Sequence, residues 1–463
     1  MGKVIGIDLG TTFSAIAELD DLGNPEVLAD PETGNRITRS AIYFGRDKVI
    51  IGEKAKDAAV TNPKKVVFEV KREMENDVVY SLKSGNFENN DSKIKGYTPS
   101  QLSSLIISKL KEFSSKIDKA VVTVPALFSE RARTATLDAA KISKLDVELI
   151  NEPTAAVLHY ANLPGNSVSG RVLIFDLGGG TFDITIAHVK GKKVDVITSV
   201  GDKELGGQDF DREIIKLISK KYKKSKNSNI DIGDRSLLKV AEKIKKMLSA
   251  KDKVSEIVEG PKGPLKIEIT KNEFENSIDT YIEKIKMLTE EALDRAECKP
   301  SNISQTLLVG GSTRMPIIID LIKKILKKAP TKGVNVDEAV ACGAAIYAGL
   351  QNKSSLNSAQ KKAISKVELN DVCNHYMGTL IYAKDNERNQ LIEVNDIVIP
   401  RDTKIPCSIT KQYQVLADDQ KRIDCSVTQS EGEERDIEFV HVIANEPLEL
   451  KKGAKQGDPF KVT

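Results

Sequence analysis

Two stretches of the chain share one pattern of apolar and polar positions. In each, an apolar run ends in an aspartate, a glycine–threonine turn follows, and a second apolar run begins; the stretches are 4–19 and 174–184. Apolar runs separated by such turns predict strand, turn, strand. Because glycines leave the backbone bare, N–H groups of each turn can close around an anion, most commonly phosphate. The duplication predicts two similar halves that hold a nucleotide between them.

Elsewhere the apolar spacing alternates between the periods of helix and strand. Helices are predicted over 98–115, 214–222, 237–249, 271–296 and 336–349, strands over 120–124, 147–150 and 305–309, and a hairpin over 260–270. Strands that alternate with helices indicate an α/β architecture. From residue 372 onward, short alternating runs at 412–415, 423–427 and 437–443 predict a small all-β module, which stops part-way into a strand as if truncated.

The chain of 463 residues is too long for one ordinary core and predicts two or three domains. The expected boundaries are a first domain at 1–352, a Ser-, Asn- and Lys-rich linker at 353–371 and the β module at 372–463. The net charge of +3 is nearly neutral. The lysine run at 220–224 is therefore interpreted as a solvated helix face, and no nucleic-acid partner is expected.

Cysteine usage and hydropathy indicate the compartment. The five cysteines are scattered without a CxxC pair, which argues against disulfides and zinc and suits a reducing environment. No apolar run approaches the length of a membrane span, and the N-terminus lacks a signal-peptide pattern. We expect a cytoplasmic protein without a membrane partner.

Candidate residues for phosphoryl transfer accompany the two turns. The chain has no GxxxxGK[ST] segment, which excludes a P-loop. Phosphoryl transfer to water needs positioning and charge neutralisation more than covalent chemistry. Asp8 and Asp176 would hold a cation, mainly through its waters, because an acid beside a phosphate is otherwise repulsive. Glu152 and Thr181 would orient the attacking water, and Lys71 would bind the γ-phosphate or that water.

A second group of residues suits the nucleoside. Gly310 and Gly311 form a bare turn at a predicted strand-to-helix junction, where a helix N-terminus favours anions. Glu242, Lys245 and Ser249 share one helix face and could bind a ribose and an adenine edge. Taken alone, such a polar stripe is typical of a solvated helix face.

Eight segments in order carry a resemblance to a known family. They are IGIDLGTTFSAIA, NPKKVVFEVKR, VVTVPALFSERARTATLDAAKIS, LINEPTAAVLHY, IFDLGGGTFDITI, LGGQDFD, AEKIKKMLS and LLVGGSTRMP. Together they resemble the seventy-kilodalton heat-shock chaperones of the DnaK type over residues 1 to about 350. The resemblance implies a two-lobed, actin-like α/β ATPase domain, with ATP or ADP, Mg²⁺ and K⁺ between the lobes, followed by a β-sandwich that binds peptides.

The resemblance also implies a role for each matching residue. Lys71, Glu152, Asp176 and Thr181 would be catalytic, and Asp8 and Asp176 would lie at the metal. ATP would be bound by Gly10, Thr11, Thr12, Gly178, Gly179, Gly180, Glu242, Lys245, Ser249, Gly310, Gly311, Ser312 and Arg314. Pro125 and Arg133 fall on the family's proline switch, which relays nucleotide state outward.

The C-terminal part resembles the family's peptide-binding domain more weakly. Counting without gaps from Pro406 places Tyr413, Leu416 and Ile423 on the peptide groove, although an ordinary sandwich core would also have apolar residues there. The family's helical lid is missing. The segment 367–371 keeps one leucine where the family has three, and Glu368 is expected to disfavour docking on an apolar groove.

The sequence therefore predicts an ATP-hydrolysing chaperone for extended apolar peptides, with a J-domain co-chaperone and a nucleotide-exchange factor as partners implied by the resemblance. Three alternatives stay open: an actin-like ATPase that forms filaments, a small-molecule kinase, and an ATP-binding adaptor without coupling between its domains.

Overall fold

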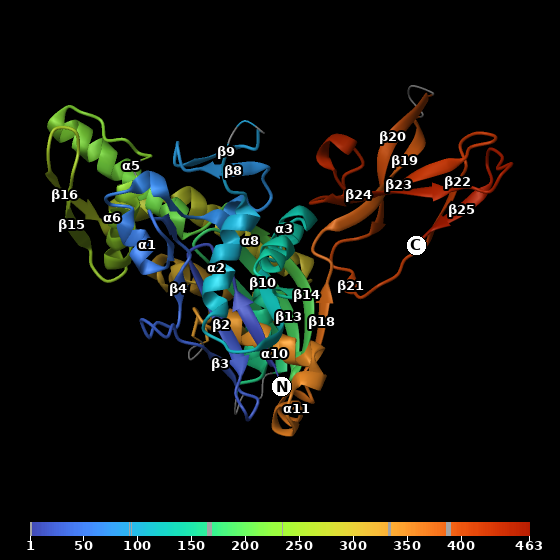
Figure 1. The fold of residues 1–463 in the computed structure, drawn as a ribbon, viewed down its shortest axis with the longest axis horizontal. Coiled ribbons are helices and arrows are strands. Elements are labelled where there is room, and N and C mark those ends of the chain that lie inside the picture. Colours follow the sequence, from blue (N-terminus) through green and yellow to red (C-terminus); the bar gives the residue numbers. More distant parts are fainter. Residues whose placement is uncertain are drawn as a thin grey trace. The chain divides into compact units, whose positions relative to one another are not determined.

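The fold is described from a computed structural model over residues 2–91, 93, 95–163, 169–233, 235–331, 335–385 and 390–463 (Figure 1). The chain divides into two compact units. The first comprises Met1–Phe128, Ala132–Asp195 and Ser199–Leu369, and the second comprises Ser129–Arg131, Val196–Thr198 and Asn370–Thr463. Among the described residues, no helix is both long and apolar enough to cross a membrane.

Two six-stranded sheets each contain one of the two repeated stretches, and both stretches belong to the first unit. The first has the order β11-β10-β1-β2-β3, with β4 also pairing β2. Its strands are β1 (Lys3–Asp8), β2 (Phe13–Leu19), β3 (Pro25–Val27), β4 (Thr38–Arg39), β10 (Ile117–Val124) and β11 (Val147–Asn151). β1 pairs antiparallel with β2 and parallel with β10. The predicted strand–turn–strand is therefore present in the first stretch.

The second sheet repeats this arrangement. Its order begins β17-β12-β13-β14 and continues through β18 to β21. The strands are β12 (Ser169–Leu177), β13 (Phe182–Lys190), β14 (Lys193–Asp202), β17 (Ile303–Val309), β18 (Glu368–Val372) and β21 (Lys404–Ile405). β12 pairs antiparallel with β13 and parallel with β17, as β1 does with β2 and β10. Mixed α/β character and the duplication were both predicted correctly.

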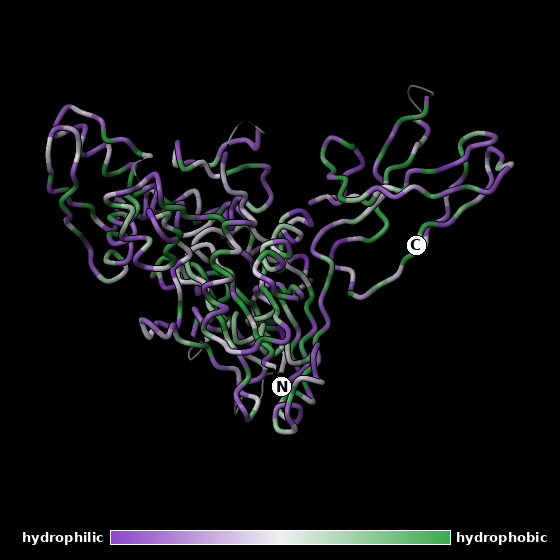
Figure 2. The backbone as a smooth tube through the Cα atoms, in the orientation of Figure 1, coloured by the Kyte–Doolittle hydropathy of each residue, from purple (hydrophilic) through white to green (hydrophobic). Residues whose placement is uncertain are grey.

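Helices cover the sheets and bury their apolar strands. α2 (Pro99–Lys111) begins with a capping box at Thr98 and buries Leu102 and Ile107 in the core that holds Ile5 and Ile7 of β1. α10 (Ala339–Gln351) packs against both β1 and α4 (Glu152–Ala161). Figure 2 shows the apolar stretches concentrated in the sheet strands of the first unit. The chain also forms α3 (Glu130–Ile142) and α9 (Pro316–Leu326).

The chain between the second sheet's strands supplies a helical region with a hairpin. It contains α5 (Gly207–Lys226), α6 (Arg235–Leu248), β15 (Lys253–Val258), β16 (Leu265–Thr270), α7 (Lys271–Ser277) and α8 (Asp279–Arg295). The single helix predicted over 271–296 is wrong. The chain leaves helical geometry at Ile278 (φ −105°, ψ 6°), whose side chain is fully buried, and a new helix begins at once.

The segment 353–371, expected as a linker, contains regular secondary structure over most of its length. It forms η5 (Lys353–Ser355), α11 (Ser358–Ile364) and the first residues of β18. Gln360 Nε2 donates to the carbonyl oxygens of Leu19 at 3.2 Å and Asp20 at 3.0 Å. The Glu368 N–H donates to the Lys192 carbonyl oxygen at 3.2 Å. The expectation about the Glu368 side chain stays a prediction, because this contact uses the backbone.

The second unit is all-β over its C-terminal residues. A four-stranded antiparallel sheet has the order β20-β19-β23-β24, with β19 (Tyr376–Asp385), β20 (Gln390–Ile399), β23 (Arg422–Ser430) and β24 (His441–Glu449). β22 (Lys411–Gln414) pairs with β25 (Pro459–Val462) in a separate ladder. The run expected as one strand at 437–443 begins as the 3-10 turn η6 (Ile437–Phe439) before β24.

The three residues expected on a peptide groove lie in different parts of this unit. Tyr413 is on β22, where its hydroxyl donates to Asp396 Oδ2 at 2.8 Å and its ring lies 5.8 Å from that of Phe460. Ile423 is on β23 in the other sheet. Leu416 follows β22 and is 40% exposed. Their assignment to one groove stays a prediction.

Candidate functional site

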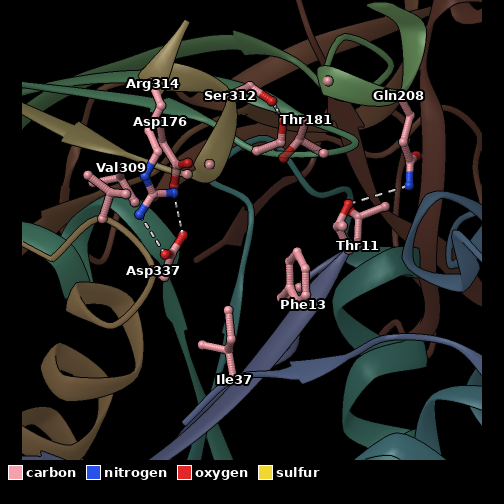
Figure 3. A pocket seen from close by; sticks show the side chains of 18 of the residues that line it. Thr11, Phe13, Ile37, Asp176, Thr181, Gln208, Val309, Ser312, Arg314 and Asp337 are labelled. Carbon is pink, nitrogen blue, oxygen red and sulfur yellow. Dashed lines mark hydrogen bonds and ion pairs between the residues drawn. The ribbon is translucent and has the colours of Figure 1, made fainter. Parts of the chain in front are cut away.

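A cavity of about 490 Å³ in the first unit is lined by the ends of both sheets. Every residue that the sequence assigned to catalysis, metal, phosphate or adenosine lines it except Gly180. Figure 3 shows Thr11, Phe13 and Ile37 on the side of the first sheet, with Asp176, Thr181 and Ser312 on the side of the second. A cavity of this size with convergent polar groups is typical of a small-molecule site.

The two glycine–threonine turns lie in contact with each other across this cavity. A β-carbon on Gly179 would lie 1.8 Å from Thr12 Oγ1, and one on Gly180 would lie 2.6 Å from Thr11 Cγ2. Any side chain at either position would therefore force the turns apart. The glycines allow the close approach that places both turns around one ligand.

The carbonyls of the second turn are hydrogen-bonded to other parts of the first unit. The Gly178 oxygen accepts from Gly207 N–H at 3.0 Å and from Ser312 Oγ at 2.9 Å, and the Gly179 oxygen accepts from Gln208 N–H at 2.9 Å. In a planar trans peptide the N–H points opposite to the carbonyl. The hydrogen bonds that hold these carbonyls therefore also fix the direction of the N–H groups of Gly179 and Gly180.

Ser40 holds two carbonyl groups of the first turn. The Ser40 hydroxyl donates to the Gly10 carbonyl oxygen at 2.7 Å. The Ser40 backbone N–H donates to the Thr12 carbonyl oxygen at 2.9 Å. Ser14 Oγ accepts from Gly10 N–H at 3.1 Å. Carbonyl oxygens of both turns are thus bonded within the protein, and the N–H groups that remain are the candidate donors for a phosphate.

Acidic side chains are concentrated and buried at the inner end of the cavity. Burial, with the charge of Glu152, raises the pKa of Asp8 to about 7, the pKa of Asp183 to about 8 and the pKa of Asp176 well above its usual range. Lys71 Nζ forms a buried ion pair with the Glu152 carboxylate. The acids outnumber this lysine, so a cation is needed before they can all ionise.

The donor set suits Mg²⁺ held through water. Among the described residues, no three His, Cys, Asp or Glu side chains converge as metal ligands. Mg²⁺ commonly uses one or two carboxylates, several waters and substrate phosphates instead of an all-protein cage. Asp8 and Asp176 fit that pattern, and Asp183 provides a further buried carboxylate that the sequence analysis did not single out. The ion would neutralise charge on the phosphates.

The opposite end of the cavity carries the predicted nucleoside residues. Lys245 Nζ donates to Asp211 Oδ2 at 2.9 Å and to the Gly207 carbonyl oxygen at 2.5 Å. Arg314 makes a two-point ion pair with Asp337 at 2.6 and 3.0 Å. Glu242 and Lys245 of α6 line the cavity, as does Ser249, which directly follows the helix, so the polar stripe faces the cavity.

Glu242 joins this helix to the first sheet. Its two oxygens accept from Arg39 Nη1 and Nη2 at 2.9 Å each, from Lys56 Nζ at 3.0 Å and from Lys246 Nζ at 2.8 Å. Burial alone would raise the pKa of Glu242, but the hydrogen bonds from Arg39 and Lys246 outweigh it and hold the pKa well below its usual range. The Arg39 guanidinium also lies over the Phe13 ring, 4.8 Å from its centroid.

The two residues assigned to a relay lie behind the site. The segment after Pro125 returns to it, because the Leu127 N–H donates to the Asp183 carboxylate. Arg133 Nη1 donates to Asn151 Oδ1 at 3.0 Å, and Asn151 directly precedes Glu152. Leu127, two residues after Pro125, and Arg133 therefore contact Asp183 and Asn151, although a relay role for Pro125 and Arg133 stays a prediction.

Comparison with known protein families agrees with this site. The family model described as Hsp70 protein matches residues 4–459. The chain belongs to the Hsp70 family. Members of the Hsp70 family are in general ATP-binding chaperones that bind nucleotide with Mg²⁺. The match extends through the β module as well as the cavity, which the sequence motifs alone covered less well.

The Hsp70-family cavity contains an ion-pair cluster that should slow nucleotide release. We expect Arg39→Ala to raise the ADP dissociation rate about tenfold, because truncating one partner of a shielded ion pair acts mainly on dissociation. Stopped-flow release of a fluorescent ADP measures this rate. Lys239→Ala is the matched control, since the Lys239–Asp57 pair joins the same helix α6 to α1 (Glu53–Ala58) but is about half exposed. An unchanged rate in Arg39→Ala, or an equal rise in Lys239→Ala, would contradict this role.

Proposed function

We propose that this chain is an ATP-hydrolysing chaperone whose affinity for extended apolar peptides depends on the bound nucleotide. The two sheets of the first unit would be the two lobes of an actin-like ATPase. The observation that carries the proposal is the pair of glycine–threonine turns that line one cavity together with the buried Lys71–Glu152 ion pair and buried acids. K⁺ would join Mg²⁺ at these acids.

The chain's own residues supply each requirement of hydrolysis. The turns bind and orient the triphosphate, Glu152 orients a water, and Lys71 holds the γ-phosphate beside it. The bound Mg²⁺ would neutralise phosphate charge. These contributions are positioning and electrostatic stabilisation, which carry most of the catalysis of phosphoryl transfer.

Coupling to peptide binding is supported by the segment that leads out of the first unit. The Glu368 N–H pairs with the Lys192 carbonyl oxygen, so the chain extends the second sheet by its backbone. The Glu368 carboxylate also lies 3.3 Å from Lys193 Nζ, although both side chains are exposed. A strand added to a sheet edge can report a change in that sheet to the chain that follows. Client peptides, a J-domain co-chaperone and an exchange factor would be the partners.

Peptide-stimulated ATP hydrolysis tests the proposal. We expect an extended apolar peptide to raise the steady-state rate several-fold in the wild type. Glu368→Pro should remove this stimulation and keep the basal rate, because proline has no N–H to donate. Glu368→Ala is the control, since it keeps the N–H and loses only an exposed ion pair of small energy.

Each outcome separates the alternatives. Basal hydrolysis without stimulation in the wild type would favour the uncoupled adaptor. Hydrolysis stimulated by a sugar or by filament assembly would favour the kinase or the actin-like ATPase. Undiminished stimulation in Glu368→Pro would contradict the proposed route of coupling.

A further inference from the structure

The third carbonyl of the second turn, that of Gly180, is held by a side chain. Arg72 donates to it from Nε at 3.0 Å and from Nη2 at 2.8 Å. Arg72 belongs to η2 (Val70–Glu73) and directly follows Lys71. The residue therefore reaches from the chain segment of the proposed catalytic lysine to the turn of the second sheet.

The same guanidinium is fixed to the helix that holds the other two carbonyls. Arg72 Nη1 lies 3.2 Å from Asp209 Oδ1, and the Arg72 and Asp209 side chains are 11% and 10% exposed. Asp209 accepts the Gly206 N–H at 2.8 Å at the start of α5. Gly207 and Gln208, which come directly after Gly206, donate their N–H groups to the carbonyl oxygens of Gly178 and Gly179. One network thus holds all three carbonyls in a row.

The two Arg72 hydrogen bonds act on the peptide between Gly180 and Thr181. Gly180 has no β-carbon, so its backbone can adopt conformations that other residues avoid. Two convergent N–H donors on the Gly180 oxygen fix the plane of that peptide. They therefore also fix the Thr181 N–H, which lies on the opposite edge of the same peptide, and Thr181 lines the cavity.

We propose that Arg72 is a positioning residue for phosphoryl transfer, which aims the Thr181 N–H at the γ-phosphate. This inference rests on the ATPase function proposed above. A preorganised N–H lowers the activation free energy most when it donates to an atom on which charge develops in the transition state. A small misplacement of such a donor therefore lowers the rate by a large factor. Because Arg72 and Lys71 are adjacent on η2, the same short helix positions the lysine and sets the turn.

The test separates the chemical step from binding. Single-turnover hydrolysis of the preformed ATP complex is measured with the equilibrium affinities for ATP and ADP, for the full chain. Arg72→Ala is expected to slow the single turnover about 100-fold. Its ADP affinity should stay within about threefold of wild type, because ADP has no γ-phosphate. Arg72→Lys keeps the charge but cannot bridge the Gly180 carbonyl and Asp209 together, so only part of the rate should return.

Arg212→Ala is the matched control. Arg212 Nη1 binds the same Asp209 carboxylate at 2.7 Å, its side chain is 45% exposed, and the described structure shows no hydrogen bond from it to the turn. Its rate should remain within about twofold of wild type. The ADP-induced rise in Tm shows whether each variant is folded. If Arg72→Ala does not fold, the single-turnover rate and ADP affinity of Arg72→Lys test the inference instead.

Two results would overturn the inference. One is a single-turnover rate in Arg72→Ala within about threefold of wild type. The other is an equal loss of ATP and ADP affinity that accounts for the slower rate, since this would make Arg72 a general binding or structural residue. A wild-type chain that does not hydrolyse ATP would instead overturn the proposed function.

Discussion

Lys71→Ala is expected to abolish ATP hydrolysis while ATP still binds. The Lys71 and Glu152 side chains are 5% and 10% exposed, and their ion pair lies beside Asp8 and Asp176. Lys71 lowers the pKa of both aspartates, so its loss leaves the site more negative just where the γ-phosphate adds charge. We expect the single-turnover rate to fall at least about 1000-fold, as for loss of a charge-stabilising group in a water-poor site.

Binding should survive because the turns and the adenosine end do not depend on Lys71. Equilibrium titration with ATP should give an affinity within about tenfold of wild type. Lys65→Ala, a nearby exposed lysine on η1 (Pro63–Lys65), should keep the wild-type rate. Loss of Lys71 also leaves Glu152 buried without its cation, a costly change unless Glu152 takes up a proton. The Tm with ADP and Mg²⁺ therefore has to accompany the rates. Hydrolysis at the wild-type rate would refute the assignment of Lys71.

The parts of the site that the sequence predicts are those encoded by local pattern. The aspartate, glycines and threonine of each turn are contiguous, and their repetition at 4–19 and 174–184 indicates a shared ligand. The polar stripe of Glu242, Lys245 and Ser249 follows from helical spacing, and the structure adds that all three line the cavity, while their binding of a nucleoside stays a prediction.

The supporting residues could not be found in this way. Ser40 and Arg72 hold carbonyls of turns that are 30 and 108 residues away in the chain. A serine or an arginine is too common on protein surfaces to signal such a contact, which exists only after the sheets have formed. The Glu368 contact was missed for another reason: it is made by a backbone N–H, which every residue except proline carries.

The helix α10 depends on close packing that the sequence suggests only by its small residues. A β-carbon on Gly343 would lie 1.7 Å from the Ala155 carbonyl oxygen of α4. On the other side, a β-carbon on Gly6 of β1 would lie 2.2 Å from the Ala345 nitrogen of α10. The helix is therefore confined between two backbones and cannot shift away from a new side chain.

Gly343→Ala is accordingly expected to lower the free energy of unfolding by about 3 kcal/mol, even though alanine favours helix by about 1 kcal/mol. Urea titration of the full chain measures the change. Gly349→Ala on the same helix is the control: its β-carbon would meet the Leu19 Cδ1 atom at 2.8 Å, and a methyl group at the end of a side chain can move. That variant should remain within about 1 kcal/mol of wild type. Equal stability of the two variants would contradict the tight packing of α10 on α4. The clash at Ala155 should also disturb α4, which begins at Glu152. We therefore expect Gly343→Ala to slow hydrolysis as well, because the packing of α10 on α4 helps to place Glu152.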